Sequence, residues 1–259
     1  MEDILVKFIV CFVAGLGAGL GTGFAGMSAA AVITPILVTF LGIPAYQAVG
    51  IALASDIIAS AISAGYYWKN KNIDIKNGLI MMATVLIFTL VGSYVASFVP
   101  NSTMGSFSMV MTLLLGIKFI VKPVMTTKEK MLSVSQNKRI MQSIICGSMI
   151  GFICGFVGAG GGMMMLLILT SVLGYELKTA VGTSVFIMAF TALTGAVSHF
   201  VIDGISDITT LIFCIISTSV FAVVASKYAN KAEPKVLNRV VGVILTIIGS
   251  VILLANFIK

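Results

Sequence analysis

The chain interrupts its apolar sequence twice, at Gly23-Phe24-Ala25-Gly26-Met27-Ser28 and at Gly155-Phe156-Val157-Gly158-Ala159-Gly160-Gly161-Gly162. Glycine is costly inside a helix and useful where backbone amide groups must be exposed. Each segment is followed by a new apolar run, which indicates that one helix ends and another begins. The N-terminus of such a helix carries unpaired N–H groups and the positive end of a dipole, and both favour an anion. Glycine loops that only turn at a membrane surface are the alternative interpretation.

The composition around these segments is that of a membrane protein. Of the 259 residues, 59% are hydrophobic and 10% are charged, whereas an ordinary soluble domain has about 25% charged residues. Too little polar surface remains to cover a water-soluble fold, which argues against a soluble enzyme, a disordered chain and a nucleic-acid binder. A membrane helix takes about 20 apolar residues, so we predict an all-α polytopic membrane protein. Its apolar runs lie at residues 4–22, 28–41, 45–67, 77–99, 103–122, 140–157, 160–173, 179–202, 208–226 and 240–258.

These runs form two sets of five, and the second set repeats the first. A shift of 132 residues superposes Gly15, Gly19, Gly23 and Gly26 on Gly147, Gly151, Gly155 and Gly158. Self-similarity at a fixed shift is typical of a duplicated chain. We therefore predict an N-terminal membrane repeat over 1–125, a cytoplasmic linker over 126–139 and a C-terminal membrane repeat over 140–259, which together make one domain.

The distribution of Lys and Arg predicts that the two repeats are inverted. The loop at 68–77 carries three Lys residues, whereas the equivalent loop at 200–209 carries two Asp residues and no basic residue. Since basic residues favour the cytoplasmic side, equivalent loops lie on opposite sides. If 68–77 lies on the cytoplasmic side, only Lys7 and Lys259 of the 16 basic residues lie on the outer side. Both termini are then predicted on the outer side of the cytoplasmic (inner) cell membrane. The charges leave open whether 28–41 and 160–173 cross fully or are re-entrant.

Four short motifs mark the second half of the chain. They are Gly151-Phe152-x-x-Gly155-x-x-Gly158-x-Gly160-Gly161-Gly162, Leu173-Gly174, Ala180-Val181-Gly182-Thr183-Ser184 and Gly195-Ala196-Val197-Ser198-His199. Together with Gly23-Phe24-x-Gly26, Thr34-Pro35 and Ala48-Val49-Gly50 of the first half, they resemble the TauE/SafE family of membrane proteins over nearly the whole chain. The resemblance implies export or uptake of small sulfur-containing anions such as sulfite and organosulfonates. Family members often have Pro in the helix after the second glycine segment, where this chain has none, so that helix is expected to be straighter.

The predicted substrate-binding residues lie at the two glycine segments and at nearby hydroxyl groups. No Arg lies deep in an apolar run, so helix N-termini, backbone N–H groups and hydroxyls would hold the anion. The candidates are Gly23, Phe24, Gly26, Ser28, Gly155, Phe156, Gly158, Gly160, Gly161, Thr183 and Ser184. Tight helix packing is the alternative explanation of the glycines spaced four apart.

Two ionisable residues are candidates for proton coupling. Asp56 lies near the centre of the run at 45–67, where an acidic side chain costs about 2.5–3.5 kcal/mol; a hydrogen-bonded structural carboxylate is the alternative. His199 is the single histidine and ends a run, where a hydrogen-bonded interfacial residue is the alternative. Hydroxyl groups on the same two helices are expected to bond back to their own backbone; they belong to Ser60, Ser63, Thr191 and Thr194.

These expectations describe a secondary transporter that moves a small anion, a sulfur-containing oxyanion or an organosulfonate, with coupling to protons. An anion channel and a membrane-embedded enzyme are the alternatives, although no HExxH motif, GxSxG motif or clustered acid–base pair supports an enzyme. The expected partners are the anionic substrate and the lipid bilayer, with no nucleic acid, cofactor or metal. The sequence leaves open a homo-oligomer, the substrate's identity, the direction of transport and the coupling ion.

Overall fold

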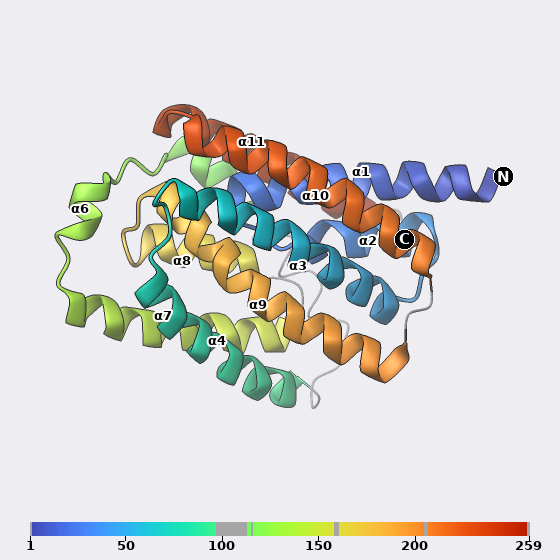
Figure 1. Cartoon of the computed structure of the whole chain (residues 1–259), viewed down its shortest axis with the longest axis horizontal. Helices are drawn as coiled ribbons and strands as arrows, with labels where there is room; N and C mark the ends of the chain where they lie inside the picture. Colours follow the sequence, from blue (N-terminus) through green and yellow to red (C-terminus); the bar gives the residue numbers. More distant parts are fainter. Residues whose placement is uncertain (1, 97–112, 115, 158–160, 205–206, 258–259) are drawn as a thin grey trace.

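The structure, a computed structural model, describes residues 2–96, 113–114, 116–157, 161–204 and 207–257. The described residues form helices and no strand, which confirms the prediction of an all-α protein (Figure 1). The helices are α1 (Glu2–Ala25), α2 (Ala30–Phe40), α3 (Ala45–Lys69), α4 (Ile75–Ala96), α6 (Lys128–Leu132), α7 (Gln136–Val157), α8 (Gly161–Ser171), α9 (Leu177–Asp203), α10 (Ile208–Lys231) and α11 (Pro234–Phe257). Residues 113–114 and 116–121 are also helical.

Five of the described helices are long and apolar enough to cross a membrane, which confirms the polytopic class. The spans are Ile4–Ala25, Tyr46–Lys69, Leu177–Val201, Ile208–Lys231 and Pro234–Val251. The helices α2 and α8 have 11 residues each and are therefore about 16 Å long. A hydrocarbon core is about 30 Å thick, so neither of these two short helices can cross it alone.

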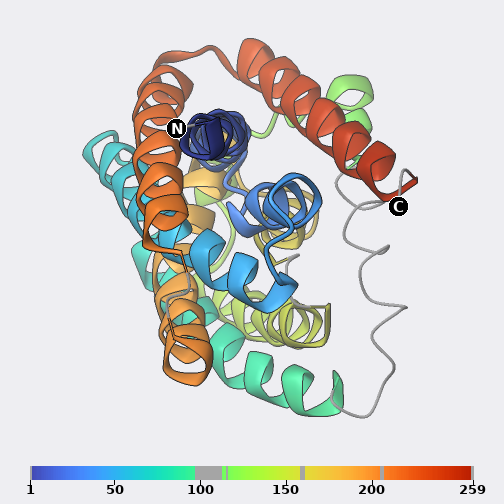
Figure 2. The same cartoon turned by 90° about the vertical axis from the view of Figure 1, so that its right-hand side faces the viewer.

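The two short helices lie among the longer ones, in opposite halves of the molecule. Helix α2 runs back toward the end that holds the N-terminus, and α8 runs toward the end that holds α6 (Figure 1). Seen end-on, both lie near the middle of the molecule, with longer helices above, below and to the left of them (Figure 2). The chain therefore places one helix start from each half within the protein interior, as expected of broken helices at a midplane site.

Glycines bring α1 and α10 into close contact. A Cβ atom added to Gly19 would lie 2.5 Å from the carbonyl oxygen of Thr218, and one added to Gly23 would lie 2.5 Å from the Cβ of Ala225. Gly15 likewise lies against the backbone of α10. Because only a hydrogen fits at these positions, the two backbones approach directly. The packing interpretation of the spaced glycines is thus confirmed for α1.

Two further helix pairs complete the packing pattern. Helix α7 packs along α4, with Gly147 and Gly151 against Thr84 and Val85, and α3 packs along α9. The 132-residue shift relates α1 to α7, α3 to α9 and α4 to α10. If each helix is replaced by its equivalent in the other half, the pair α1–α10 becomes the pair α7–α4. The pair α3–α9 becomes α9–α3, which is the same pair. The packing agrees with a duplicated chain, and the inverted repeat stays a prediction from sequence.

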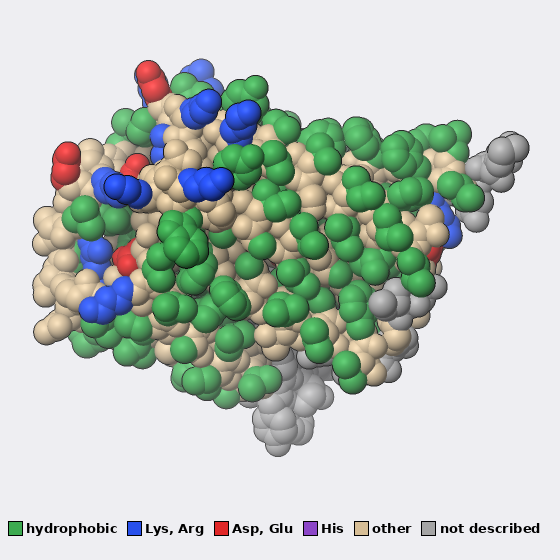
Figure 3. Space-filling model, viewed as in Figure 1, with side chains coloured by type: hydrophobic (Ala, Val, Ile, Leu, Met, Phe, Trp, Pro, Cys, Tyr) green, Lys and Arg blue, Asp and Glu red, His purple; other side chains and the backbone are tan. Residues whose placement is uncertain are grey.

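Basic side chains gather at one end of the molecule. The face seen in Figure 3 is covered by apolar side chains over most of its length, with Lys and Arg concentrated at the end that holds α6. The ends of α3 and α10 and the starts of α4, α7, α9 and α11 lie at this end. The positive-inside rule would place it in the cytoplasm, and the orientation of the termini stays a prediction.

At the opposite end an ion pair joins the two halves. The Lys7 ammonium lies 3.0 Å from the Asp207 carboxylate, which also accepts hydrogen bonds from the backbone N–H (3.0 Å) and the hydroxyl (2.8 Å) of Thr210 at the start of α10. Burial alone would raise the pKa of Asp207, but the hydrogen bonds from Thr210 and Lys7 outweigh it and hold this pKa below its ordinary value. Asp207 is therefore the N-terminal cap of α10.

Candidate functional site

The break between α1 and α2 has a defined backbone geometry. Gly26 has a φ of +62°, a conformation that residues with a Cβ rarely adopt. Its N–H donates to the carbonyl of Thr22 (2.9 Å), and its own carbonyl accepts from the hydroxyl of Ser184 on α9 (2.8 Å). The Thr22 hydroxyl donates to the carbonyl of Met27 (2.9 Å). Side chains thus satisfy the carbonyl groups of Gly26 and Met27 at the break.

A buried carboxylate lies at the start of α2. The Asp56 side chain, 1% exposed, accepts hydrogen bonds from the hydroxyls of Ser28 (2.6 Å) and Ser60 (2.8 Å). The hydroxyl of Ser28 in turn accepts from the backbone N–H of Ala30 (3.3 Å). Within the described residues no Lys or Arg pairs with Asp56. We call Ser28, Asp56 and Ser60 the Asp56 cluster.

Two more side chains of α3 share the face that carries Asp56. Positions 56, 60, 63 and 67 recur at helical spacing and lie on one side of the helix. Tyr67, at the far end of this face, donates its hydroxyl to the carbonyl of Gly23 (2.9 Å). Ser63 lies between and is fully buried, and its hydroxyl oxygen has no hydrogen-bond partner in the part of the chain that the structure describes. This face of α3 is therefore turned toward the α1–α2 break and holds one unused hydroxyl.

The expectation that the four hydroxyls on α3 and α9 bond back to their own helices is half right. Thr191 and Thr194 do so, donating to the carbonyls of Met188 and Phe190. Ser60 instead donates to the Asp56 carboxylate, and Ser63 does not bond back. For Ser60 the reason is that a carboxylate one turn away is a stronger acceptor than a helix carbonyl that already accepts a backbone N–H.

The structure brings together part of the predicted binding set. Gly23, Gly26, Ser28 and Ser184 all lie at the α1–α2 break or contact it, and Phe24 packs against the apolar core beside it. Gly155 and Phe156 lie in the last turn of α7, and Gly161 begins α8. Gly158 and Gly160 lie outside the described residues.

Thr183 lies apart from the Asp56 cluster. Its hydroxyl accepts a hydrogen bond from the backbone N–H of Asp74 (3.1 Å), just before α4, and its methyl group faces Gly78. Because successive residues of a helix point about 100° apart, Thr183 faces α4 while its neighbour Ser184 faces the α1–α2 break. In this structure Thr183 helps to position the start of α4.

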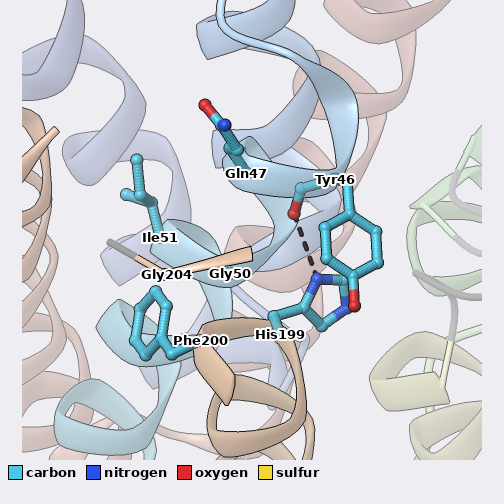
Figure 4. A pocket seen from close by; sticks show the side chains of 7 residues that line it. All are labelled: Tyr46, Gln47, Gly50, Ile51, His199, Phe200 and Gly204. Carbon is cyan, nitrogen blue, oxygen red and sulfur yellow. Dashed lines mark hydrogen bonds between the residues drawn. The ribbon is translucent and has the colours of Figure 1, made fainter. Parts of the chain in front are cut away.

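His199 lies at the end of the molecule that holds the termini. Its Nδ1 is 3.0 Å from the carbonyl oxygen of Tyr46, and the two rings are 4.1 Å apart between centroids (Figure 4). A small pocket forms there between the start of α3 and the end of α9, lined by Tyr46, Gln47, Gly50, Ile51, His199, Phe200 and Gly204. The structure thus places the two predicted proton-coupling residues in different regions.

A second buried polar network, which sequence reasoning missed, lies at the basic end. Asp74 accepts from the hydroxyl of Tyr175 (2.8 Å), from the side chain of Asn77 (2.7 Å) and from Arg139 (3.5 Å). Arg139 also donates to the carbonyl of Met131 in the linker. Burial, together with the charge of Asp74, raises the pKa of Tyr175 above its ordinary value. The network ties the α3–α4 loop to the linker, to α7 and to the α8–α9 loop.

Known proteins resemble this chain over most of its length. The family model described as "Sulfite exporter TauE/SafE" matches residues 11–252. The probable membrane transporter protein YdhB of Bacillus subtilis is 23% identical over 249 residues, covering 96% of this chain and 100% of the relative. YunE of the same organism, also a probable membrane transporter protein, is 26% identical over 216 residues, covering 76% of this chain and 79% of the relative.

An archaeal relative is more similar over a shorter stretch. The probable membrane transporter protein MJ0441 of Methanocaldococcus jannaschii is 30% identical over 200 residues, covering 76% of this chain and 70% of the relative. The family and all three relatives support a membrane transporter rather than an enzyme. With its apolar helices, its broken α1–α2 segment and a match over residues 11–252, the chain belongs to the TauE/SafE family.

Proposed function

We propose that the protein is a secondary transporter that moves a small anion, a sulfur-containing oxyanion or an organosulfonate, across the cytoplasmic membrane, with proton coupling through Asp56. The observation that carries this proposal is the Asp56 cluster. Two hydroxyls converge on one buried acceptor at the start of a helix. These donors are of the kind that bind the oxygen atoms of an anion.

The chemistry of the cluster suits a small oxyanion. Hydroxyl and amide donors match the oxygens of a sulfite or sulfonate group, and the positive end of the α2 dipole adds a partial charge. The side chains around the break are small, with Gly26 before Ser28 and Ala29 and Ala30 after it. A compact head group would fit there better than a bulky one.

Burial of the cluster favours a carrier over a channel. Asp56 is 1% exposed and Ser60 is fully buried, and so is Ser63 farther along the same face of α3. A carrier keeps its site closed from at least one side during the cycle, whereas a conducting pore needs a continuous polar path. In reconstituted vesicles we expect saturable uptake and counterflow driven by trapped substrate; flux that rises linearly with concentration and shows no counterflow would favour a channel.

Ligand binding to the purified protein tests the substrate class. Sulfite, methanesulfonate, thiosulfate and acetate are compared by thermal shift, because a ligand that binds the folded state raises its melting temperature by mass action. We expect stabilisation by at least one sulfur-containing anion and less by acetate. Stabilisation by acetate alone would reject the sulfur-anion class.

A serine variant locates the site. Ser28→Ala removes one donor, and because a hydrogen bond to a charged group contributes about 1.5–3 kcal/mol, we expect binding to weaken by about tenfold or more. Ser148→Ala is the matched control, since that hydroxyl bonds only to the carbonyl of Ile144 in its own helix. Equal affinity in the two variants would place the substrate elsewhere.

A further inference from the structure

The Asp56 carboxylate already uses the donors that an anionic substrate would need. Its two oxygens accept from the hydroxyls of Ser28 (2.6 Å) and Ser60 (2.8 Å). A substrate oxyanion bound at the start of α2 would compete for the same groups. The site therefore already holds one negative charge, and that charge belongs to the protein.

We infer that Asp56 is a tethered competitor, so that the substrate anion binds only when Asp56 is protonated and each substrate travels with one proton. This inference rests on the proposed function and specifies how that function is coupled. When Asp56 gains a proton it loses its charge, and its hydrogen bond from Ser28 weakens because a neutral carboxyl is a poorer acceptor than a carboxylate. The Ser28 hydroxyl can then turn to the substrate.

Two features of the cluster support an exchange of this kind. First, no cation of the described residues pairs with Asp56, so two neighbouring anions would repel each other in a region of low dielectric. Second, Ser63 lies on the same face of α3, fully buried, with an oxygen that has no hydrogen-bond partner within the described residues. An anion at the break would gain this unused donor.

The surrounding titratable groups do not share the role. Tyr67 is on the same face of α3, but its hydroxyl donates to the Gly23 carbonyl, and α2 carries no titratable side chain. The helices packed against α3 carry further titratable residues, and those whose side chains the structure describes lie toward helix ends or at the α1–α10 contact. None of these hydrogen bonds to Asp56: Lys7, Cys11, Lys178, His199, Cys214, Lys227, Tyr228 and Lys231. Proton uptake linked to substrate binding is therefore assigned to Asp56.

Calorimetric titration with methanesulfonate tests the inference, because a sulfonate stays ionised from about pH 5.5 to 8.5 and any proton taken up enters the protein. Titration in buffers of different ionisation enthalpy counts these protons. Where Asp56 is charged we expect one proton taken up per anion bound. Above the pH at which Asp56 loses its proton, the Kd should rise about tenfold per pH unit, as one linked proton requires.

Variants assign the proton to its residue. Asp56→Asn should bind with an affinity that no longer depends on pH and with no proton uptake. Asp207→Asn is the matched control, because Asp207 is likewise a hydrogen-bonded carboxylate beside the start of a helix, but it pairs with Lys7 at the far end; it should keep the one-proton dependence. Ser60→Ala keeps Asp56 but removes a donor to its charged form, so the midpoint of the pH dependence should move upward.

Each result decides between the two proposals. Binding by the wild type without proton uptake would overturn the tethered competitor, and so would folded Asp56→Asn that no longer binds. If Asp56→Asn does not fold, the proton count of the wild type and the shift in Ser60→Ala decide instead. Failure of the wild type to bind any of the sulfur-containing anions would reject the proposed function itself.

Discussion

Replacing Gly26 by Ala tests whether the α1–α2 break is held by its contact with α9. Gly26 has a φ of +62°, and Gly42 after α2 has a φ of +63°. An alanine at either position therefore incurs the same conformational cost, about 1–2 kcal/mol, of a left-handed backbone. A Cβ at Gly26 would lie 3.1 Å from both the Val181 carbonyl oxygen and the Ser184 Cβ, whereas one at Gly42 meets nothing within 4 Å. The pair of variants therefore separates packing from backbone strain.

The magnitude follows from these contacts. To admit the methyl group, α9 must shift, and the hydrogen bond from Ser184 to the Gly26 carbonyl weakens. Losing such a bond costs about 0.5–1.5 kcal/mol, and overpacking adds about 1 kcal/mol or more. We expect Gly26→Ala to lower the free energy of unfolding by about 2.5–4.5 kcal/mol and Gly42→Ala by about 1–2 kcal/mol.

Thermal melting of both purified variants in the same detergent measures the difference. At about 2–4 °C per kcal/mol for a chain of this size, Gly26→Ala should melt several degrees below Gly42→Ala. It should also lose transport, because Ser28 follows two residues later. Equal melting temperatures and equal uptake in the two variants would show that the contact with α9 does not hold the break.

Three further outcomes are expected. Gly19→Ala should destabilise the α1–α10 contact by about 1–3 kcal/mol. Gly65→Ala is the control, because no atom lies within 4 Å of a Cβ added at this helical position. It should be neutral or slightly stabilising in the same melting assay. Arg139→Met should cost about 3 kcal/mol in chemical denaturation, since it leaves the Asp74 carboxylate, whose side chain is only 13% exposed, without its cation; an unchanged midpoint would contradict the network. Because the pKa of Asp207 is lowered in the folded state, its contribution to stability is present above the ordinary Asp pKa and is lost as the pH falls through the lowered value. The Asp207→Asn variant should therefore lose less stability than the wild type on acidification to about pH 3, and an identical acid profile would refute this assignment.

Periodicity and glycine spacing predicted the helices and the two breaks because these features depend on local sequence. The central carboxylate was predicted for the same reason, since Asp56 lies in the middle of an apolar run. Its partner Ser28 is 28 positions away and meets it only because α2 folds back beside α3. No local pattern encodes that packing, so the sequence supplied the candidates but not the cluster.

The directions of side chains within one motif were also beyond the sequence. Thr183 and Ser184 are adjacent, yet one contacts the start of α4 and the other contacts Gly26. The network of Asp74, Arg139 and Tyr175 was missed because its members come from three separate segments, each of which resembles an ordinary charged or polar loop. A single acidic residue between Lys71 and Lys76 was the one available signal.

The close contact of α1 with α10 has a consequence for how the protein is made. The ion pair between Lys7 and Asp207 joins residues 200 positions apart, so α1 leaves the ribosome long before its partner exists. Contacts of such long sequence separation form late and slowly. Until α10 is inserted, the glycine-lined side of α1 faces lipid or a membrane chaperone. We expect chains truncated before α10 to be degraded in the cell, although every helix of their first half is present.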